Sequence, residues 1–235
     1  MRMFAACLLA VLACQRLKEP PRPASIPAEA DRDRRTGLWS LKTAQESVTY
    51  YSDGSLYSKG PVGPLGERTG HWAYYSPGAK QTLSQGEFVR DWRDGIWNFY
   101  DEKGRLYLSM TYAQEPKRDF IFLVTHDYGN ENGTYRRYYP DGRLEEEGGF
   151  KAGYYEGPVT RYHPNGRPLL RGQYQKDTVV GRWLYYYPDG TLLREENYVN
   201  GALDGKLRSF YPDGRVYVES NYKDGVRSET PIVHR

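Results

Sequence analysis

Apolar residues recur along this chain in step with a glycine that returns every 24 residues, at Gly142, Gly166, Gly190 and Gly214. An aromatic residue stands four positions before each of these glycines, and before Gly54, Gly78 and Gly104 in the first half of the chain; the column is Tyr50, Tyr74, Tyr100, Tyr138, Tyr162, Tyr186 and Phe210. A second aromatic column follows the glycines, at Phe88, Tyr112, Phe150, Tyr174, Tyr198 and Tyr222. Short apolar runs on either side of a turn predict paired β-strands. The fixed period predicts one supersecondary unit stacked many times.

The residues around each glycine predict a tight turn. Tyr-Tyr-Pro-Asp-Gly occurs at Tyr138–Gly142 and Tyr186–Gly190, with close variants at Tyr162–Gly166 and Phe210–Gly214. Proline presets φ, Asp or Asn tolerates the next position, and glycine takes the left-handed conformation that closes a three-residue hairpin loop. A looser second turn is predicted at Asp94-Gly95, Glu156-Gly157, Val180-Gly181 and Asp204-Gly205. We therefore predict an all-β fold, an elongated single-layer stack of about seven β-hairpin repeats.

The repeats are predicted to span residues 37–225, and the tail 226–235 is expected to cover the last strand edge. The period fails most strongly between Gly104 and Gly142, which are 38 residues apart. The resulting insertion, 113–132, contains the apolar residues Phe120 and Phe122. Insertions in stacked repeats map to loops and often to the binding face, which makes both phenylalanines candidate contact residues. The alternative is an extra strand or hairpin that fills a break in the ladder.

The first 13 residues predict a secretory signal, because Arg2 is followed by the apolar run Met3–Ala13. This run is too short to span a bilayer, which needs about 20 residues. Val11-Leu12-Ala13-Cys14 resembles the lipobox of bacterial lipoproteins, which implies lipidation of Cys14, and Gln15 after it resembles an outer-membrane sorting signal. An ordinary signal peptide cut elsewhere is the alternative. Residues 14–36 are rich in proline and charge and predict a disordered tether.

Charge and cysteine content exclude several classes of function. The chain has 33 basic and 30 acidic residues, a net charge of +3, and the basic residues are spread through the repeats. Nucleic-acid binding usually needs a concentrated basic patch, so no nucleic-acid partner is expected. Of the two cysteines, Cys7 would leave with the signal and Cys14 would carry lipid. The rest of the chain has no thiol for a disulfide, a nucleophile or a zinc site.

Candidate catalytic groups are few. The four histidines, His71, His126, His163 and His234, are scattered without zinc-site spacing. Nucleophile-elbow, phosphate-loop and dinucleotide motifs are missing from the sequence. The acidic runs Glu145–Glu147 and Glu195–Glu196 could supply a glycosidase-like carboxylate pair, but a solvated strand face is the favoured interpretation. We predict a protein that is not an enzyme and that uses neither metal nor cofactor.

A further column stands three residues before the glycines and includes Tyr139, His163, Tyr187 and Tyr211. Alternation along a strand would place these rings on the opposite face from the preceding aromatic column. An exposed row of tyrosines suits the binding of a peptide, a protein edge or a glycan, because each ring offers flat apolar area and a hydroxyl. The alternative is that these residues are structural.

The repeat resembles the MORN family, and most closely its bacterial, antitoxin-like variant. The matching segments are Tyr138–Leu144 with Gly157, and Tyr186–Leu192 with Gly205. The resemblance implies a scaffold or a protein- or lipid-binding module. We therefore expect a lipid-anchored protein of the bacterial cell envelope, carried on the outer membrane, whose repeats bind a protein partner. A glycan or peptidoglycan-binding module and an antitoxin or immunity-type protein that captures an effector are the alternatives.

Overall fold

The computed structural model describes residues 21–113 and 131–234, and these form one antiparallel sheet of 20 strands. The first strands are β1 (Asp31–Arg32), β2 (Trp39–Lys42), β3 (Glu46–Tyr50), β4 (Leu56–Pro61), β5 (Gly70–Tyr75), β6 (Thr82–Val89), β7 (Trp92–Tyr100) and β8 (Leu106–Tyr112). The next are β9 (Glu131–Tyr138), β10 (Leu144–Lys151), β11 (Tyr154–Tyr155), β12 (Gly157–Tyr162), β13 (Pro168–Gln175) and β14 (Thr178–Tyr186). The last are β15 (Leu192–Val199), β16 (Ala202–Leu203), β17 (Gly205–Phe210), β18 (Val216–Lys223), β19 (Val226–Arg227) and β20 (Ile232–Val233).

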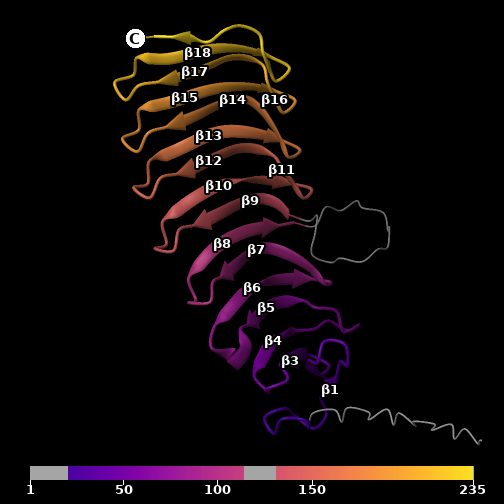
Figure 1. Ribbon diagram of the computed structural model, residues 1–235. Helices are drawn as coiled ribbons and strands as arrows, with labels where there is room; N and C mark the ends of the chain where they lie inside the picture. Colours follow the sequence, from indigo (N-terminus) through magenta and orange to yellow (C-terminus); the bar gives the residue numbers. More distant parts are fainter. Residues whose placement is uncertain (1–20, 114–130, 235) are drawn as a thin grey trace, which may run out of the picture.

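Strands that follow one another in sequence lie side by side, so the sheet grows from one end to the other without crossing over. Figure 1 shows this as an elongated, twisting stack with the described N-terminal residues at one end and the C-terminus at the other. This arrangement confirms the predicted all-β stack of hairpins.

Seven tight turns join the two strands of successive hairpins in the described residues. In six of them the turn glycine has a positive φ and the first turn residue donates its N–H to the carbonyl four residues later; the pairs are Tyr51–Ser55, Asp101–Arg105, Tyr139–Arg143, His163–Arg167, Tyr187–Thr191 and Tyr211–Arg215. The seventh turn is longer and contains the 3-10 turn η1 (Pro77–Ala79), with Ser76 donating to Gln81. The extra length explains why this unit departs from the period of the others.

The second turn of each unit lies elsewhere than predicted. Two-residue turns with positive φ at both central positions, as in type I′ hairpins, occur at Arg90-Asp91, Ala152-Gly153, Lys176-Asp177, Asn200-Gly201 and Asp224-Gly225. The predicted glycines, such as Gly157 and Gly205, also have positive φ, but they lie where the next strand begins. The observed turns begin four residues before the predicted ones, as Arg90 does before Asp94. Glycine alone does not locate them, because Arg90-Asp91 and Lys176-Asp177 contain no glycine, and glycines elsewhere in the unit also have positive φ.

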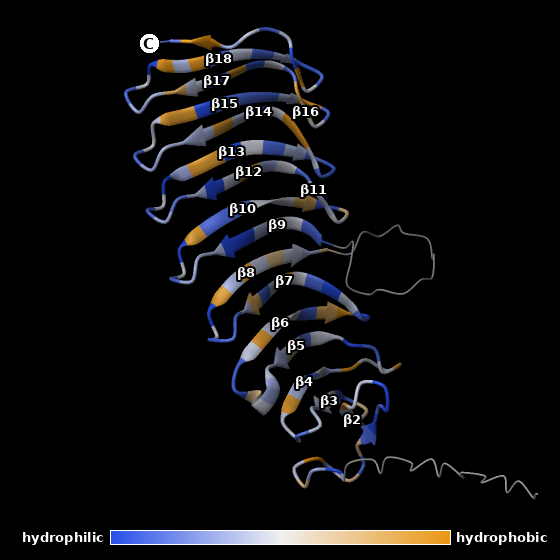
Figure 2. Ribbon diagram, in the orientation of Figure 1, coloured by the Kyte–Doolittle hydropathy of each residue, from blue (hydrophilic) through white to orange (hydrophobic). Residues whose placement is uncertain are grey.

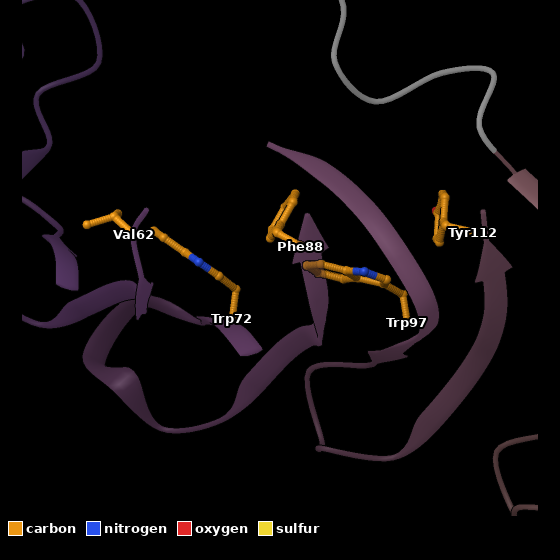
Figure 3. Packing of buried hydrophobic residues seen from close by; sticks show 5 residues of the cluster. All are labelled: Val62, Trp72, Phe88, Trp97 and Tyr112. Carbon is orange, nitrogen blue, oxygen red and sulfur yellow. The ribbon is translucent and has the colours of Figure 1, made fainter. Parts of the chain in front are cut away.

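The most deeply buried column is carried by the first strands of five hairpins, β5, β7, β9, β12 and β14. It comprises Trp72, Trp97, Tyr135, Val159 and Trp183. We call the face of the sheet that carries these residues the inner face. Figure 3 shows Trp97 on the concave side of the bent strands, between Phe88 and Tyr112. The aromatic column that was expected to be packed, represented by Tyr138 and Tyr186, is only half-buried, because these residues belong to the opposite, outer face. Tyr74 is the exception: it lies two residues after Trp72 on the inner face and packs against the buried cluster.

The indole rings of the inner face lie over glycines of the preceding strand. Trp72 covers Gly60, Trp97 covers Gly86, and Trp183 covers Gly172. A methyl group at Gly86 would approach the Trp97 ring to 2.5 Å, which is closer than real contacts allow. A single-layer sheet can therefore bury a large aromatic residue where the neighbouring strand has no side chain.

The sheet continues directly across the insertion. β8 pairs with β9, with Leu108 opposite Arg137. The ladder therefore has no break between β8 and β9 for an extra strand or hairpin to fill. Its residues 114–130, including Phe120 and Phe122, lie outside the described residues, as does Cys14. At the C-terminal end, β19 and β20 lie along β18.

Residues 21–36 differ from the disordered tether that their composition predicts. Ile26 and Ala30 are 1% and 7% exposed, and β1 pairs with β2. Ser25 donates its hydroxyl to the carbonyl of Gly54, which joins this segment to the first tight turn. Two buried apolar side chains and one short strand pair are present in this segment although it has no long apolar run.

Candidate binding surface

The surface most suited to binding is a line of directly opposed residues that crosses the C-terminal half of the sheet. From β9 to β15 it runs Arg137, Glu146, Arg161, Leu170, Tyr185 and Arg194. Directly opposed residues of neighbouring strands point to the same face. Arg137 lies two residues after Tyr135, and Arg161 two after Val159, so the line lies on the inner face.

A buried carboxylate holds the first two arginines of this line. Glu146 accepts a hydrogen bond from the Tyr135 hydroxyl at 2.9 Å and from Arg161 Nε at 2.7 Å, and Arg137 Nη1 approaches it to 3.4 Å. The Glu146 side chain is 8% exposed, whereas those of Arg137 and Arg161 are 40% and 43% exposed. Burial, reinforced by the Glu146 carboxylate, raises the pKa of the Tyr135 hydroxyl. The hydroxyl therefore stays protonated and remains a donor to Glu146.

A second buried carboxylate holds the third arginine. Glu196 lies opposite Trp183, at the position that other hairpins fill with a glycine such as Gly172. Its side chain is 7% exposed and lies 3.0 Å from Arg194 Nε, whose side chain is 43% exposed. The Tyr198 hydroxyl donates to Glu196 at 3.0 Å, and burial followed by this bond raises the pKa of Tyr198.

The Arg194 guanidinium also lies over the ring of Tyr185, 4.4 Å from its centroid. A guanidinium held by a carboxylate on one side and an aromatic ring on another loses little further freedom when it binds a ligand. Figure 2 shows that the ends of β9 and β12 are hydrophilic. The inner face therefore offers fixed positive groups above buried negative ones.

The tyrosine column expected to bind a ligand has a different role in the structure. Tyr139 donates its hydroxyl to the Tyr162 carbonyl at 2.7 Å and Tyr187 to the Phe210 carbonyl at 3.0 Å, while His163 Nε2 lies 2.9 Å from the Tyr186 carbonyl. Each of these contacts joins one hairpin to the next. Tyr211 packs against Tyr217, with ring centroids 5.0 Å apart. All four residues are half-buried, so they form a ladder between turns rather than an exposed row.

Consecutive glutamates are separated by the sheet. Glu146 lies on the inner face, whereas Glu147 accepts a hydrogen bond from Tyr162 on the outer face at 2.7 Å. Glu195 likewise pairs with the outer residue Arg182 at 2.7 Å. Neighbouring carboxylates therefore do not face each other as a catalytic pair. The interpretation of both acidic runs as solvated strand face is wrong for Glu146 and Glu196, which are buried.

Sequence reasoning missed Arg137, Arg161 and Arg194. The signal that could have found Arg137 and Arg161 is their spacing, since each stands two residues after a member of the buried column, Tyr135 or Val159. Among residues 21–113 and 131–234, no group of three His, Cys, Asp or Glu side chains is placed to hold a metal ion. In the same residues, no helix is long and apolar enough to cross a membrane.

Comparison with known protein families agrees with this repeat structure. The model of the MORN repeat variant matches residues 131–152, 179–200 and 203–224. The chain carries MORN repeats. The matched segments correspond to the hairpins β9–β10, β14–β15 and β16–β18. No curated protein matches the sequence. MORN repeats form a repeat-based binding module, in keeping with the fixed inner surface.

Three solved structures are also similar to parts of the chain. They are the GtfA/B complex bound to UDP and GlcNAc, the TCP10 domain of Danio rerio CPAP in complex with a peptide of Danio rerio STIL, and TcdB2-TccC3 without its hypervariable C-terminal region. Their sequence identities are 16%, 14% and 14%, with TM-scores of 0.21, 0.23 and 0.24. The similarity covers 53%, 82% and 80% of this chain, and 22%, 98% and 10% of those structures. The chain thus spans about a fifth of the first structure and nearly all of the second.

Proposed function

We propose that this MORN-repeat chain is a non-catalytic lipoprotein of the bacterial cell envelope whose hairpin stack is a protein-interaction scaffold. The observation that carries the proposal is the inner face of β9–β15, where three half-exposed arginines are fixed above two buried carboxylates. Fixed guanidiniums and half-buried tyrosines are typical of protein-binding surfaces, where they contribute contact area and hydrogen bonds at a small entropic cost.

The same geometry supports a non-catalytic role. Each inner carboxylate is engaged by an arginine and by a tyrosine hydroxyl, as at Glu146 and Glu196. A general acid or base needs a free approach to the proton that it transfers. Groups that are held in this way position other side chains rather than react with a substrate.

The location follows from the N-terminal sequence. The apolar run Met3–Ala13 and the lipobox-like Val11-Leu12-Ala13-Cys14 support export and lipidation at Cys14. Gln15 supports sorting to the outer membrane. Replacing Cys14 with Ser should move the protein from the membrane fraction to the soluble fraction and abolish incorporation of labelled palmitate. Retention of both properties in C14S would contradict lipid anchoring.

The scaffold role is tested by crosslinking in cells followed by purification of the full chain. We expect one dominant protein partner to be recovered with the full chain. A parallel chain that lacks Ala113–Asn132 shows whether the insertion, with Phe120 and Phe122, contributes to the contact. Recovery of cell-wall or glycan material alone would favour the glycan-binding alternative. Capture of a single toxic effector, with toxicity when this chain is deleted, would favour the antitoxin alternative.

A further inference from the structure

We propose that Arg137, Arg161 and Arg194, together the arginine row, bind an extended acidic segment of a polypeptide that lies along the stack, across the strands. The inference rests on the proposed function, because it assigns the partner chemistry of the same inner face. It is carried by the charge of the arginine row, by the contacts that hold its side chains, and by its spacing.

Charge is arranged by depth along the arginine row. The arginine side chains are 40–43% exposed, whereas Glu146 and Glu196 beneath them are 7–8% exposed. A ligand that approaches the inner face therefore meets guanidinium groups first. Arg161 binds Glu146 through Nε and Nη2, which leaves the N–H groups of Nη1 for a ligand. Carboxylates are the natural partners of such groups, because charge-assisted hydrogen bonds are stronger than neutral ones.

The guanidiniums are held in place before a ligand arrives. Glu146 lies between the two strands that carry Arg137 and Arg161 and contacts both side chains. Arg194 is fixed by Glu196 and by the ring of Tyr185. Ordering long side chains on binding has an entropic cost. Because these arginine side chains are already ordered in the folded protein, little of that cost remains when a ligand binds.

The spacing of the row fits an extended polypeptide. Arg137 and Arg161 flank a single strand, β10, so they stand about 10 Å apart, because strands are separated by about 4.8 Å. Arg194 lies three strands beyond Arg161, at about 14 Å. An extended or polyproline chain advances by about 3.1–3.3 Å per residue, so acidic residues separated by about three and then four or five positions match both intervals.

Leu170 and Tyr185 occupy the longer interval and favour a polypeptide over an anionic glycan. Both are half-buried residues of the same line, between Arg161 and Arg194. They offer an apolar contact to a side chain of a polypeptide ligand. A chain of uronic acids has no apolar side chain to make this contact. Toward the N-terminus the same line continues as Tyr74, Ser84, Phe99 and Leu108. Because these residues are uncharged, the site is confined to β9–β15.

The test uses the full chain and a fluorescently labelled peptide. The peptide carries glutamates three and then four residues apart, with leucine in the longer interval and serine and proline elsewhere. Its binding is compared with that of the same peptide with glutamine at every glutamate, and with polygalacturonate. We expect measurable binding of the acidic peptide, weakened at least about tenfold in the glutamine peptide, since each charge-assisted hydrogen bond contributes about that factor.

Matched variants separate the arginine row from general charge. R137A, R161A and R194A should each weaken binding of the acidic peptide by about tenfold. R136A, R171A and R182A remove arginines from the outer face of the same region and should change it by less than about twofold. Thermal unfolding of all six variants identifies any whose fold has changed. A triple inner variant replaces Arg137, Arg161 and Arg194 together with Ala, or with Lys if the Ala form fails to fold.

Three results would overturn the inference: equal losses for inner and outer variants, no binding of the acidic peptide, or row-dependent binding of polygalacturonate but not of peptide. Repeating the cellular crosslinking with the triple inner variant distinguishes this inference from the scaffold role. If the triple inner variant still captures the partner, the arginine row is not the binding site, but the scaffold role is unaffected. A chain that captures no protein in either form would refute the scaffold itself.

Discussion

Single glycines decide whether the aromatic core of this sheet can form. Gly86 and Gly172 lie directly beneath Trp97 and Trp183, and a side chain at either position would enter the indole ring. Trp97 is 0% exposed and contacts Phe88, with ring centroids 4.9 Å apart. The ring therefore has little room to move away. The size of one residue on one strand thus controls the burial of the largest residue on the next.

Replacing Gly86 with Ala should lower the free energy of unfolding by about 1–3 kcal/mol, the usual cost of overfilling a packed site. The measurement is the urea unfolding transition followed by circular dichroism. Ser84→Ala in the same strand is the matched control, because Ser84 is partly exposed and its replacement should cost no more than about 0.5 kcal/mol. A G86A protein as stable as S84A would show that the Trp97 ring is not confined by the glycine.

The tight turns are the part of the structure that the sequence predicts best, and their chemistry is local. Asp141 accepts the backbone N–H of Arg143 at 3.0 Å, and the equivalent bond joins Asp189 to Thr191 at 2.8 Å. Hydrogen bonds from the Arg143 side chain and backbone lower the pKa of Asp141. A turn held by its own residues leaves a signal in sequence that needs no knowledge of the neighbouring hairpins.

At the scale of the hairpin, a bulge explains why the binding surface could not be predicted in the same way. The register shifts between Leu144 and Glu146, opposite Tyr138 and Arg137. Equivalent shifts occur in the other hairpins, as beside Tyr162 and Tyr186. A bulge adds one residue to one strand, so every later residue of that strand points to the face opposite to the one that simple alternation predicts. Counting alternate positions from the turn therefore assigns the second strand to the wrong face.

Cross-strand ion pairs on the last complete hairpin add a pH dependence to stability. Glu219 of β18 accepts hydrogen bonds from Lys206 Nζ at 2.8 Å and Arg208 Nε at 2.6 Å, both from β17. The bonds from Lys206 and then Arg208 lower the pKa of Glu219 from 4.5 to about 2. A lowered pKa means that the folded state binds the proton less readily than the unfolded chain. The stabilisation is therefore complete above about pH 4.5 and is lost as the pH falls toward 2.

We expect E219Q to be less stable than the natural protein at pH 6, and the difference to shrink as the pH falls from 4.5 toward 2. Melting temperatures measured by circular dichroism across this range provide the comparison. Glutamine does not titrate, so the variant reports the contribution of every other group. A difference that stays constant from pH 6 to pH 2.5 would show that the pair with Lys206 and Arg208 does not contribute through the Glu219 charge.

At the scale of the whole molecule, stacking converts a repeated hairpin into a continuous surface. One line of opposed residues runs from Asp31 near the N-terminal end to Val233 near the C-terminal end. Its character changes with the sequence of each hairpin, from Tyr74 and Phe99 in the first half to the arginine row in the second. The repeat fixes where each side chain stands, and variation at that position decides what the surface binds.

Neighbouring residues Leu170 and Arg171 provide the most direct test that the inner face of β9–β15 binds a protein partner. They lie on opposite faces of β13, because Leu170 belongs to the line between Arg161 and Tyr185, whereas Arg171 approaches the outer residue Tyr186. A photocrosslinking amino acid is placed at one position or the other in the full chain, in cells. We predict one dominant protein adduct from position 170 and little or none from position 171. An equal adduct from both positions, or a protein adduct from position 171 alone, would contradict binding through the inner face.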